Sequence, residues 1–210
     1  MTFDEYVQYI GTAENLARES GGGPRLDHSG DLRQAFESRR LTEDQVVALR
    51  WLVARPGGPA KMLVISEEFS SDCRRDVPTF ARMAAVTGME LRIFTRDGQR
   101  FWDDSRPAEE QPPDGNGDLM AHFLNFKNGR YWPSIPVCVF FTQDFEYLYH
   151  YSEYPAIYDK DRLAQNEDAP LHAEPEFMEL LASPFYRIWT SAAVDEIVSA
   201  LHRRAVLGAV

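Results

Sequence analysis

The chain has 210 residues, of which 44% are hydrophobic and 26% charged, which is enough for one sizeable domain with helical additions. Its formal net charge of −11 repels phosphate backbones and argues against a nucleic-acid partner. No apolar run approaches the roughly 20 residues of a membrane helix. The first residues are acidic where a signal peptide would be positively charged, so we expect a cytoplasmic protein without a membrane partner.

Cysteine and histidine usage limits the metal and cofactor chemistry that the chain is expected to carry. Cys73 and Cys138 are the only cysteines, too few for a disulfide scaffold or for a structural zinc site built on closely spaced pairs. Such low cysteine usage fits a reducing compartment. The five histidines are dispersed through the sequence, and no glycine-rich phosphate motif follows a strand. We therefore predict neither a metal site nor a cofactor.

The first 60 residues are predicted to form a helical extension that packs on the core. Thr2 and Glu5 have the spacing of a capping box, and the helix that they begin is expected to end near Gly21. A second capping box begins at Thr42, ahead of another amphipathic helix. Residues 1–60 therefore read as helices without strands.

The middle of the chain alternates apolar runs with one helical pattern. The run Met62–Ile65 has the character of a strand buried on both faces. Helical spacing follows from Val77 to Ala85, then a second strand is expected at Leu91–Phe94. Val137–Phe141 and Glu146–Tyr151 are predicted to form a hairpin. This order predicts an α/β fold with a mixed sheet flanked by helices, and additional helices at both ends of the chain.

The same pattern divides the chain into three segments. Residues 61–151 are expected to form the core, with an acidic surface loop near 98–117. Residues 152–210 are expected to form a C-terminal helical extension. Its last helix is predicted to begin after Ser191 and to end at Leu207.

Two short motifs stand at the ends of the expected strands. The run Ser66–Cys73, read Ser-Glu-Glu-Phe-Ser-Ser-Asp-Cys, follows the first strand and opens a helix, and Ile135-Pro136 precedes a later strand. Here the chain resembles the thioredoxin superfamily, more narrowly bacterial proteins whose motif reads Trp-Cys-Gly-Asp-Cys. Val77-Pro78 and Arg96-Asp97 match the helix proline and the second strand end of that family. The resemblance covers about 61–150 and implies a thioredoxin-like sheet with a cis peptide bond before Pro136.

The redox motif of the resembling family is degenerate in this chain. Phe69 stands where the family has Trp, Ser70 replaces the first cysteine, and Ser71 replaces the glycine. In the family the first cysteine attacks substrate disulfides as a thiolate whose pKa is lowered by the helix N-terminus. A serine hydroxyl is too weakly acidic to act in this way, so dithiol turnover at this motif is not expected.

Two interpretations of Cys73 remain open. It is the family's resolving cysteine, which could act as a monothiol through mixed disulfides or reversible oxidation. The alternative is a buried cysteine that packs as a small apolar residue. Cys138 lies inside an apolar strand, where we expect a core role and no disulfide with Cys73. Glu67 and Glu68 are adjacent, and we expect them at a solvated loop edge without converging as an acid–base pair.

Together these observations give a functional hypothesis with one alternative. The chain is expected to be a redox protein of thiol–disulfide oxidoreductase ancestry, with at most monothiol activity on a protein or low-molecular-weight thiol. The alternative is a non-catalytic peptide-binding or assembly module, whose terminal helices could form a homo-oligomer. The candidate catalytic residues are Cys73 and Ser70. The candidate substrate-binding residues are Phe69, Ser71, Asp72, Ile135 and Pro136.

Overall fold

A four-stranded mixed sheet forms the centre of the protein. The computed structural model describes residues 1–21, 23–103, 106, 110–127, 129–156 and 184–208. The strand order is β2-β1-β5-β6, with β1 and β2 parallel and the two other pairs antiparallel. The strands are β1 (Lys61–Ser66), β2 (Glu90–Thr95), β5 (Val137–Phe141) and β6 (Tyr147–Ser152). The predicted fold class, a mixed sheet flanked by helices with further helices at both chain ends, is confirmed.

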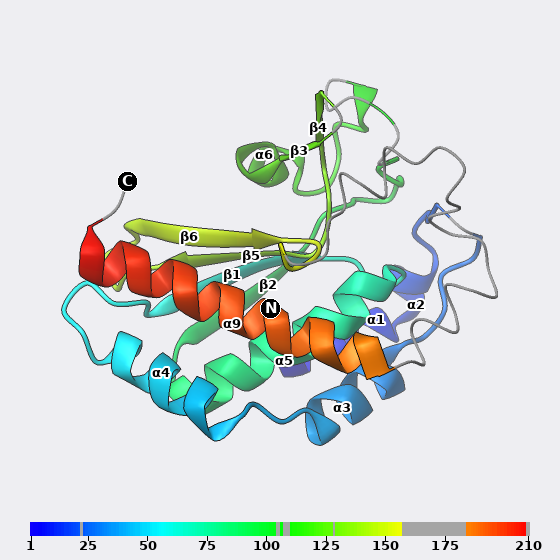
Figure 1. Cartoon of the computed structure of the whole chain (residues 1–210). Coiled ribbons are helices and arrows are strands. Elements are labelled where there is room, and N and C mark those ends of the chain that lie inside the picture. The colour runs from blue at the N-terminus through cyan, green and yellow to red at the C-terminus, as the bar shows by residue number, and fades with distance from the viewer. Residues whose placement is uncertain (22, 104–105, 107–109, 128, 157–183, 209–210) are drawn as a thin grey trace.

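Helices cover one face of the sheet, and smaller elements lie on the other side (Figure 1). The covering layer comprises α4 (Glu43–Val53), α5 (Ser71–Thr87) and α9 (Pro184–Leu207). The N-terminal segment contributes α1 (Phe3–Ile10), α2 (Ala13–Leu16) and α3 (Ser29–Ser38), of which α3 packs on α5. On the opposite side lie α6 (Gly117–Met120), the 3₁₀ helix η2 (Ala121–Phe123) and a hairpin of β3 (Asn125–Lys127) and β4 (Arg130–Trp132).

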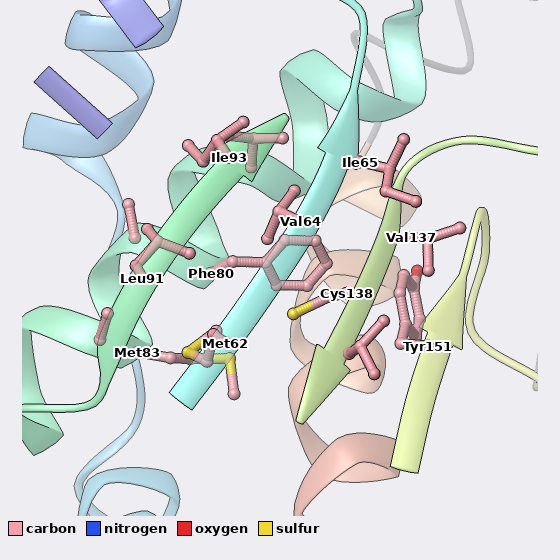
Figure 2. Close-up of a cluster of buried hydrophobic side chains, with 14 of the residues drawn as sticks. Met62, Val64, Ile65, Phe80, Met83, Leu91, Ile93, Val137, Cys138 and Tyr151 are labelled. Carbon is pink, nitrogen blue, oxygen red and sulfur yellow. The ribbon is translucent and has the colours of Figure 1, made fainter. Parts of the chain in front are cut away.

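The core lies between the sheet and α5. Figure 2 shows the Phe80 ring of α5 beside Val64 of β1, with Cys138 on the adjacent strand β5 and Tyr151 on β6 beyond it. The rings of Phe80 and Tyr151 meet edge to face at 5.7 Å. Alternation along β1 buries Val64 completely, whereas Leu63 on the opposite face is only half-buried. The expected burial on both faces is therefore complete only at the end of β1, where Ile65 is also covered.

Both predicted capping boxes are present, but the first helix is shorter than expected. The Thr2 and Glu5 pair begins α1, and the Thr42 and Gln45 pair begins α4. Helix α1 ends at Ile10 and does not reach Gly21, because Thr12 begins a separate short helix whose Asn15 N–H donates to the Thr12 side chain. Propensity alone could not place this early stop.

The C-terminal parts of the fold also differ in detail from the sequence expectations. The hairpin of β5 and β6 is present, with its loop organised by Thr142, whose hydroxyl accepts from the N–H groups of Asp144 and Glu146. Helix α9 spans Pro184–Leu207, so the prediction that it begins after Ser191 is wrong. The Ser191 side chain instead accepts a hydrogen bond from Gln45. Of the acidic loop, residues 104–105 and 107–109 lie outside the described residues, as do 157–183 of the C-terminal extension.

The capping box of α4 gives a simple test of the fold. Substituting Thr42→Ala removes the hydroxyl that accepts from the Gln45 N–H, so the free energy of unfolding should fall by about 1 kcal/mol. Urea unfolding followed by circular dichroism measures this change. Thr42→Ser retains the acceptor and should stay close to the wild type; equal losses in both variants would show that the cap is unimportant.

Candidate functional site

The two motifs of the sequence meet at one end of the sheet. In the register of the central strands, Ile65 of β1 lies opposite Val137 of β5. The residues that follow Ile65 and precede Val137 are therefore neighbours at that end. The peptide bond between Ile135 and Pro136 is cis, as the resemblance predicts. The end of β2 lies beside them, because Ser66 is paired with Thr95.

Helix α5 begins directly at the degenerate motif. Ser70 is its N-cap residue, and its hydroxyl accepts from the Cys73 N–H at 3.4 Å. Asp72 lies in the first turn, where its charge is favourable to the helix dipole, and also pairs with Arg75 at 2.9 Å. Ser70, Ser71 and Asp72 are each partly exposed. Ser70, which stands where the resembling family has its first cysteine, thus serves as a helix cap.

The sulfur of Cys73 is shut off from solvent. Its residue is 1% exposed, and burial raises the pKa of the thiol to about 12. Hydrogen bonds with Ser66, the backbone of Glu67 and Ser70 offset only part of this effect. Cys138 is also buried, with its pKa raised well above the ordinary range, and both cysteines are free. Neither thiol is ionised to an appreciable extent near neutral pH.

The N-terminal helix contributes to this burial. Tyr6 of α1 is completely buried, and its hydroxyl lies 3.0 Å from the Ser66 hydroxyl at the end of β1. Ser66 is also a hydrogen-bond partner of the Cys73 thiol. The side chains Tyr6, Ser66 and Cys73 therefore form a buried polar chain between α1 and the start of α5.

A group of buried charges lies at the loop after β1, with guanidinium groups from the N-terminal segment. Arg18 contacts Glu67 at 2.7 Å. Arg25 contacts Glu67 at 2.8 Å and Glu68 also at 2.8 Å. The side chains of Arg25, Glu67 and Glu68 have no exposed surface, and that of Arg18 is 2% exposed. The N-terminal segment is thus joined to the motif by ion pairs that water does not reach.

The end of β2 completes this group. Asp97 pairs with Arg96 at 2.7 Å and lies 3.7 Å from the Arg25 guanidinium. The Asp97 N–H donates to Glu67, and Arg18 donates to the backbone oxygens of Asp97 and Gly98. Arg96 also donates to the Pro133 carbonyl at 2.9 Å, which ties the group to the chain before the cis bond.

We call these six side chains the buried charge cluster: Arg18, Arg25, Glu67, Glu68, Arg96 and Asp97. Three positive and three negative groups balance when all are ionised, as buried charges require if they are to be stable. The expectation that Glu67 and Glu68 lie at a solvated edge is wrong, and both converge on Arg25. The arginines that hold them come from a segment that the sequence motif does not include.

A second set of ion pairs links α5 to the last strand. Arg75 pairs with Asp76 at 2.6 Å, and the Tyr151 hydroxyl of β6 donates to Asp76 at 3.0 Å. Arg75 also donates to the Glu153 carbonyl just after β6. Sequence reasoning missed Arg75 and Asp76, whose adjacency in a helix gave no sign of burial.

The residues proposed to bind a substrate divide into a buried pair, Ile135 and Pro136, and a partly exposed group in and before the first turn of α5. Ile135 is 4% exposed and Pro136 is buried. Phe69 is partly exposed; it packs edge to face on Phe101, and the Arg25 guanidinium lies over its ring at 4.9 Å. The accessible part of the site therefore consists of Phe69 and the first turn of α5, and the cis-proline side lies beneath the surface.

Two further structural findings bear on the classes of site. Among the described residues no group of three or more histidine, cysteine or acidic side chains is arranged to hold a metal ion. No helix in the same part of the chain is long and apolar enough to cross a membrane.

Comparison with known proteins gives likeness of fold only. No protein-family model matches the chain, and no curated protein matches it. A solved structure of a protein of unknown function, PA1234 from Pseudomonas aeruginosa, is similar with a TM-score of 0.55 and 15% identity, covering 97% of this chain and 93% of that one. An HIV epitope-scaffold is similar with a TM-score of 0.54 and 15% identity, covering 100% of this chain and 93% of the scaffold. These likenesses extend over nearly the whole chain, terminal helices included.

The buried charge cluster should respond strongly to the loss of one member. Arg18→Met leaves the buried Glu67 carboxylate with less compensating charge, so the free energy of unfolding at pH 7 should fall by about 3–5 kcal/mol. Urea unfolding measures the loss.

The matched control for this prediction is an exposed ion pair. Arg100 and Asp114 lie 3.0 Å apart with side chains 53% and 32% exposed, so Arg100→Met should cost less than about 1 kcal/mol. If Arg18→Met and Arg100→Met lowered the free energy of unfolding by similar amounts, the prediction that the fold depends strongly on the buried charge cluster would be wrong.

The pH dependence of stability should carry the signature of Asp97. Burial raises the pKa of its carboxyl from 3.8 to about 6, and the Arg96 guanidinium opposes this only in part. The folded chain then binds the proton more tightly than the unfolded chain, so this group's contribution to stability falls as pH rises between about 4 and 6. Asp97→Asn should remove that slope, as measured by urea midpoints across the range. If the urea midpoints of the wild type and of Asp97→Asn changed with pH in the same way, the proposed contribution of Asp97 would be ruled out.

Proposed function

We propose that the protein is a thioredoxin-fold binding module that does not catalyse thiol–disulfide exchange. The supporting sequence features are the strand-to-helix motif of Ser66–Cys73 and the Ile135-Pro136 pair. In the structure both lie at the same end of a mixed sheet, with a helix beginning at Ser70 and a cis bond before Pro136. This geometry is compatible with the fold that the resemblance implies.

The observation that carries the proposal is the state of Cys73. Exchange requires a thiolate that can reach a substrate sulfur. Cys73 is 1% exposed and its pKa is raised to about 12, compared with 9.0 for an ordinary thiol. The thiolate fraction at neutral pH is therefore lower by about a thousandfold than for a free cysteine. Ser70 stands where the resembling family has its attacking cysteine, and in this structure its side chain caps the N-terminus of α5.

The residues of the motif that remain accessible are suited to contact with another protein. Phe69 presents part of an aromatic ring, and Ser70, Ser71 and Asp72 are partly exposed beside it. The buried charge cluster anchors this loop through Arg25, which contacts both the Glu68 carboxylate and the Phe69 ring. A rigid loop that presents an aromatic side chain can bind a partner with little loss of conformational entropy. We infer that a protein segment docks on this loop.

Thiol reactivity tests the proposal directly. In a Cys138→Ala background, Cys73 in the native protein should react with 5,5′-dithiobis(2-nitrobenzoate) at least about a hundredfold more slowly than in urea, since burial suppresses both access and ionisation. Ser70→Cys serves as the positive control, because its partly exposed side chain at the N-terminus of α5 should react rapidly.

A native rate equal to the rate in urea would instead support monothiol exchange through Cys73. The binding role has its own measurement, the retention of partners by the tagged protein. Cys73→Ala should capture the same partners as the wild type, whereas Phe69→Ala should lose them. Loss of partners in Cys73→Ala alone, under conditions in which the variant is folded, would contradict a non-catalytic module.

A further inference from the structure

A hollow of about 390 Å³ lies beside the C-terminal half of α5, the helix whose first turn carries the cysteine motif. It is formed where the connection after α3 passes α4 and α5. Its apolar lining consists of Leu41, Val46 and Val86. Its size is within the range of small-molecule sites.

The charge of this hollow is opposite to that of the whole chain. The chain carries a net charge of −11, yet the hollow is lined by Arg39, Arg40 and Arg82 with Glu37 as the single acid. An isolated basic pocket on an acidic protein favours a compact anion over an extended polyanion, because the surrounding surface repels the rest of a long chain. This excludes nucleic acid and favours a small charged ligand.

The carbonyl groups at the end of α3 hold two of these arginines in place. Arg40 donates to the carbonyl oxygens of Glu37 at 2.6 Å and Arg39 at 2.8 Å. Arg82 donates to the Phe36 carbonyl, and its guanidinium lies over the Phe36 ring at 4.0 Å. These are favourable positions for cations, since the last carbonyls of a helix carry partial negative charge. The arginines are therefore fixed before any ligand arrives.

This fixation leaves most of the binding capacity of the two guanidinium groups unused. A guanidinium has five N–H donors, and a carbonyl partner does not neutralise its charge. In the part of the chain that the structure describes, neither Arg40 nor Arg82 has a carboxylate within ion-pair distance, and the Nε–H of Arg82, which is itself buried, has no hydrogen-bond partner. By contrast, all three arginines of the buried charge cluster contact carboxylates.

We propose that this hollow is a binding site for a small organic phosphate. The phosphate group would accept hydrogen bonds from Arg40 and Arg82, for which a guanidinium fork has the matching geometry. The organic part would lie against the apolar lining of Leu41, Val46 and Val86. A phosphate monoester is favoured over a single carboxylate because it carries about two negative charges near neutral pH, and several cations face the hollow. The inference is independent of the binding role proposed for the Phe69 loop.

Calorimetric titration with phenyl phosphate tests this site. The wild type should bind it saturably, more tightly than inorganic phosphate, which lacks the apolar part, and more tightly than phenol, which lacks the charge. Arg40→Gln should weaken binding at least about tenfold. Arg40 is exposed and donates only to backbone carbonyls, so this substitution should leave the unfolding temperature close to that of the wild type.

The matched control removes the same charge elsewhere. Arg203→Gln, at an exposed position on α9, should leave phenyl phosphate binding within about twofold. A second variant, Arg82→Lys, keeps the charge but loses the planar fork and should also weaken binding. The proposal is overturned if phenyl phosphate shows no saturable binding to the folded wild type. It is also overturned if Arg203→Gln weakens binding as much as Arg40→Gln, because binding would then depend on the net charge of the protein and not on this site.

Discussion

The buried charge cluster is the constraint on which the motif region depends. Ionic groups without access to water are stable only when each has a partner, and removal of one leaves the others uncompensated. Arg18 and Arg25 come from the N-terminal segment, Glu67 and Glu68 from the end of β1, and Arg96 and Asp97 from the end of β2. The contacts of Arg18 and Arg25 with both Glu67 and Asp97 therefore define how three distant parts of the chain meet.

At the same end of the sheet, Ser70 and Cys73 have structural roles in the start of α5. Ser70 caps α5 and the Cys73 thiol is enclosed by Ser66, Ser70 and the buried Tyr6 hydroxyl nearby. A helix N-terminus by itself lowers the pKa of a thiol, but here desolvation outweighs it, and the pKa is raised. A cysteine in the first turn of a helix is therefore not made reactive by that position alone, and at Cys73 burial has the larger effect on the thiol pKa.

Much of the fold could be predicted from local patterns. Apolar runs located β1, β2 and β5, and a turn signal located β6 as the second arm of a hairpin. The capping boxes at Thr2 and Thr42 located the starts of two helices, because these signals depend on neighbours in sequence. The early end of α1 at Ile10 depended on the Thr12 side chain, which competes as a new cap. The start of α9 at Pro184 was missed because the pattern after Ser191 was the more regular one.

The site was predicted less completely than the fold. The motif residues and the cis bond before Pro136 were located, because they are contiguous in sequence or implied by the resemblance. The burial of Glu67 and Glu68 was not, since an acidic pair after a strand is usually solvated and its partners lie more than 40 residues away. Two arginines beside a glycine run, Arg18 and Arg25, are no signal by themselves. Local periodicity cannot predict tertiary contacts of this kind, because the partners are far apart in the sequence.

The separation of these partners along the chain also has a consequence for how the protein folds. Arg25 and Glu67 are 42 residues apart, and Arg18 lies 79 residues from the Asp97 carbonyl that it contacts. Closing loops of this length costs entropy before the contacts form, so we expect such pairs to form later than the hairpin of β5 and β6. Until then the charges remain hydrated. During synthesis the arginines leave the ribosome well ahead of the carboxylates that neutralise them, and the final expulsion of water from this region has to wait until β2 is complete.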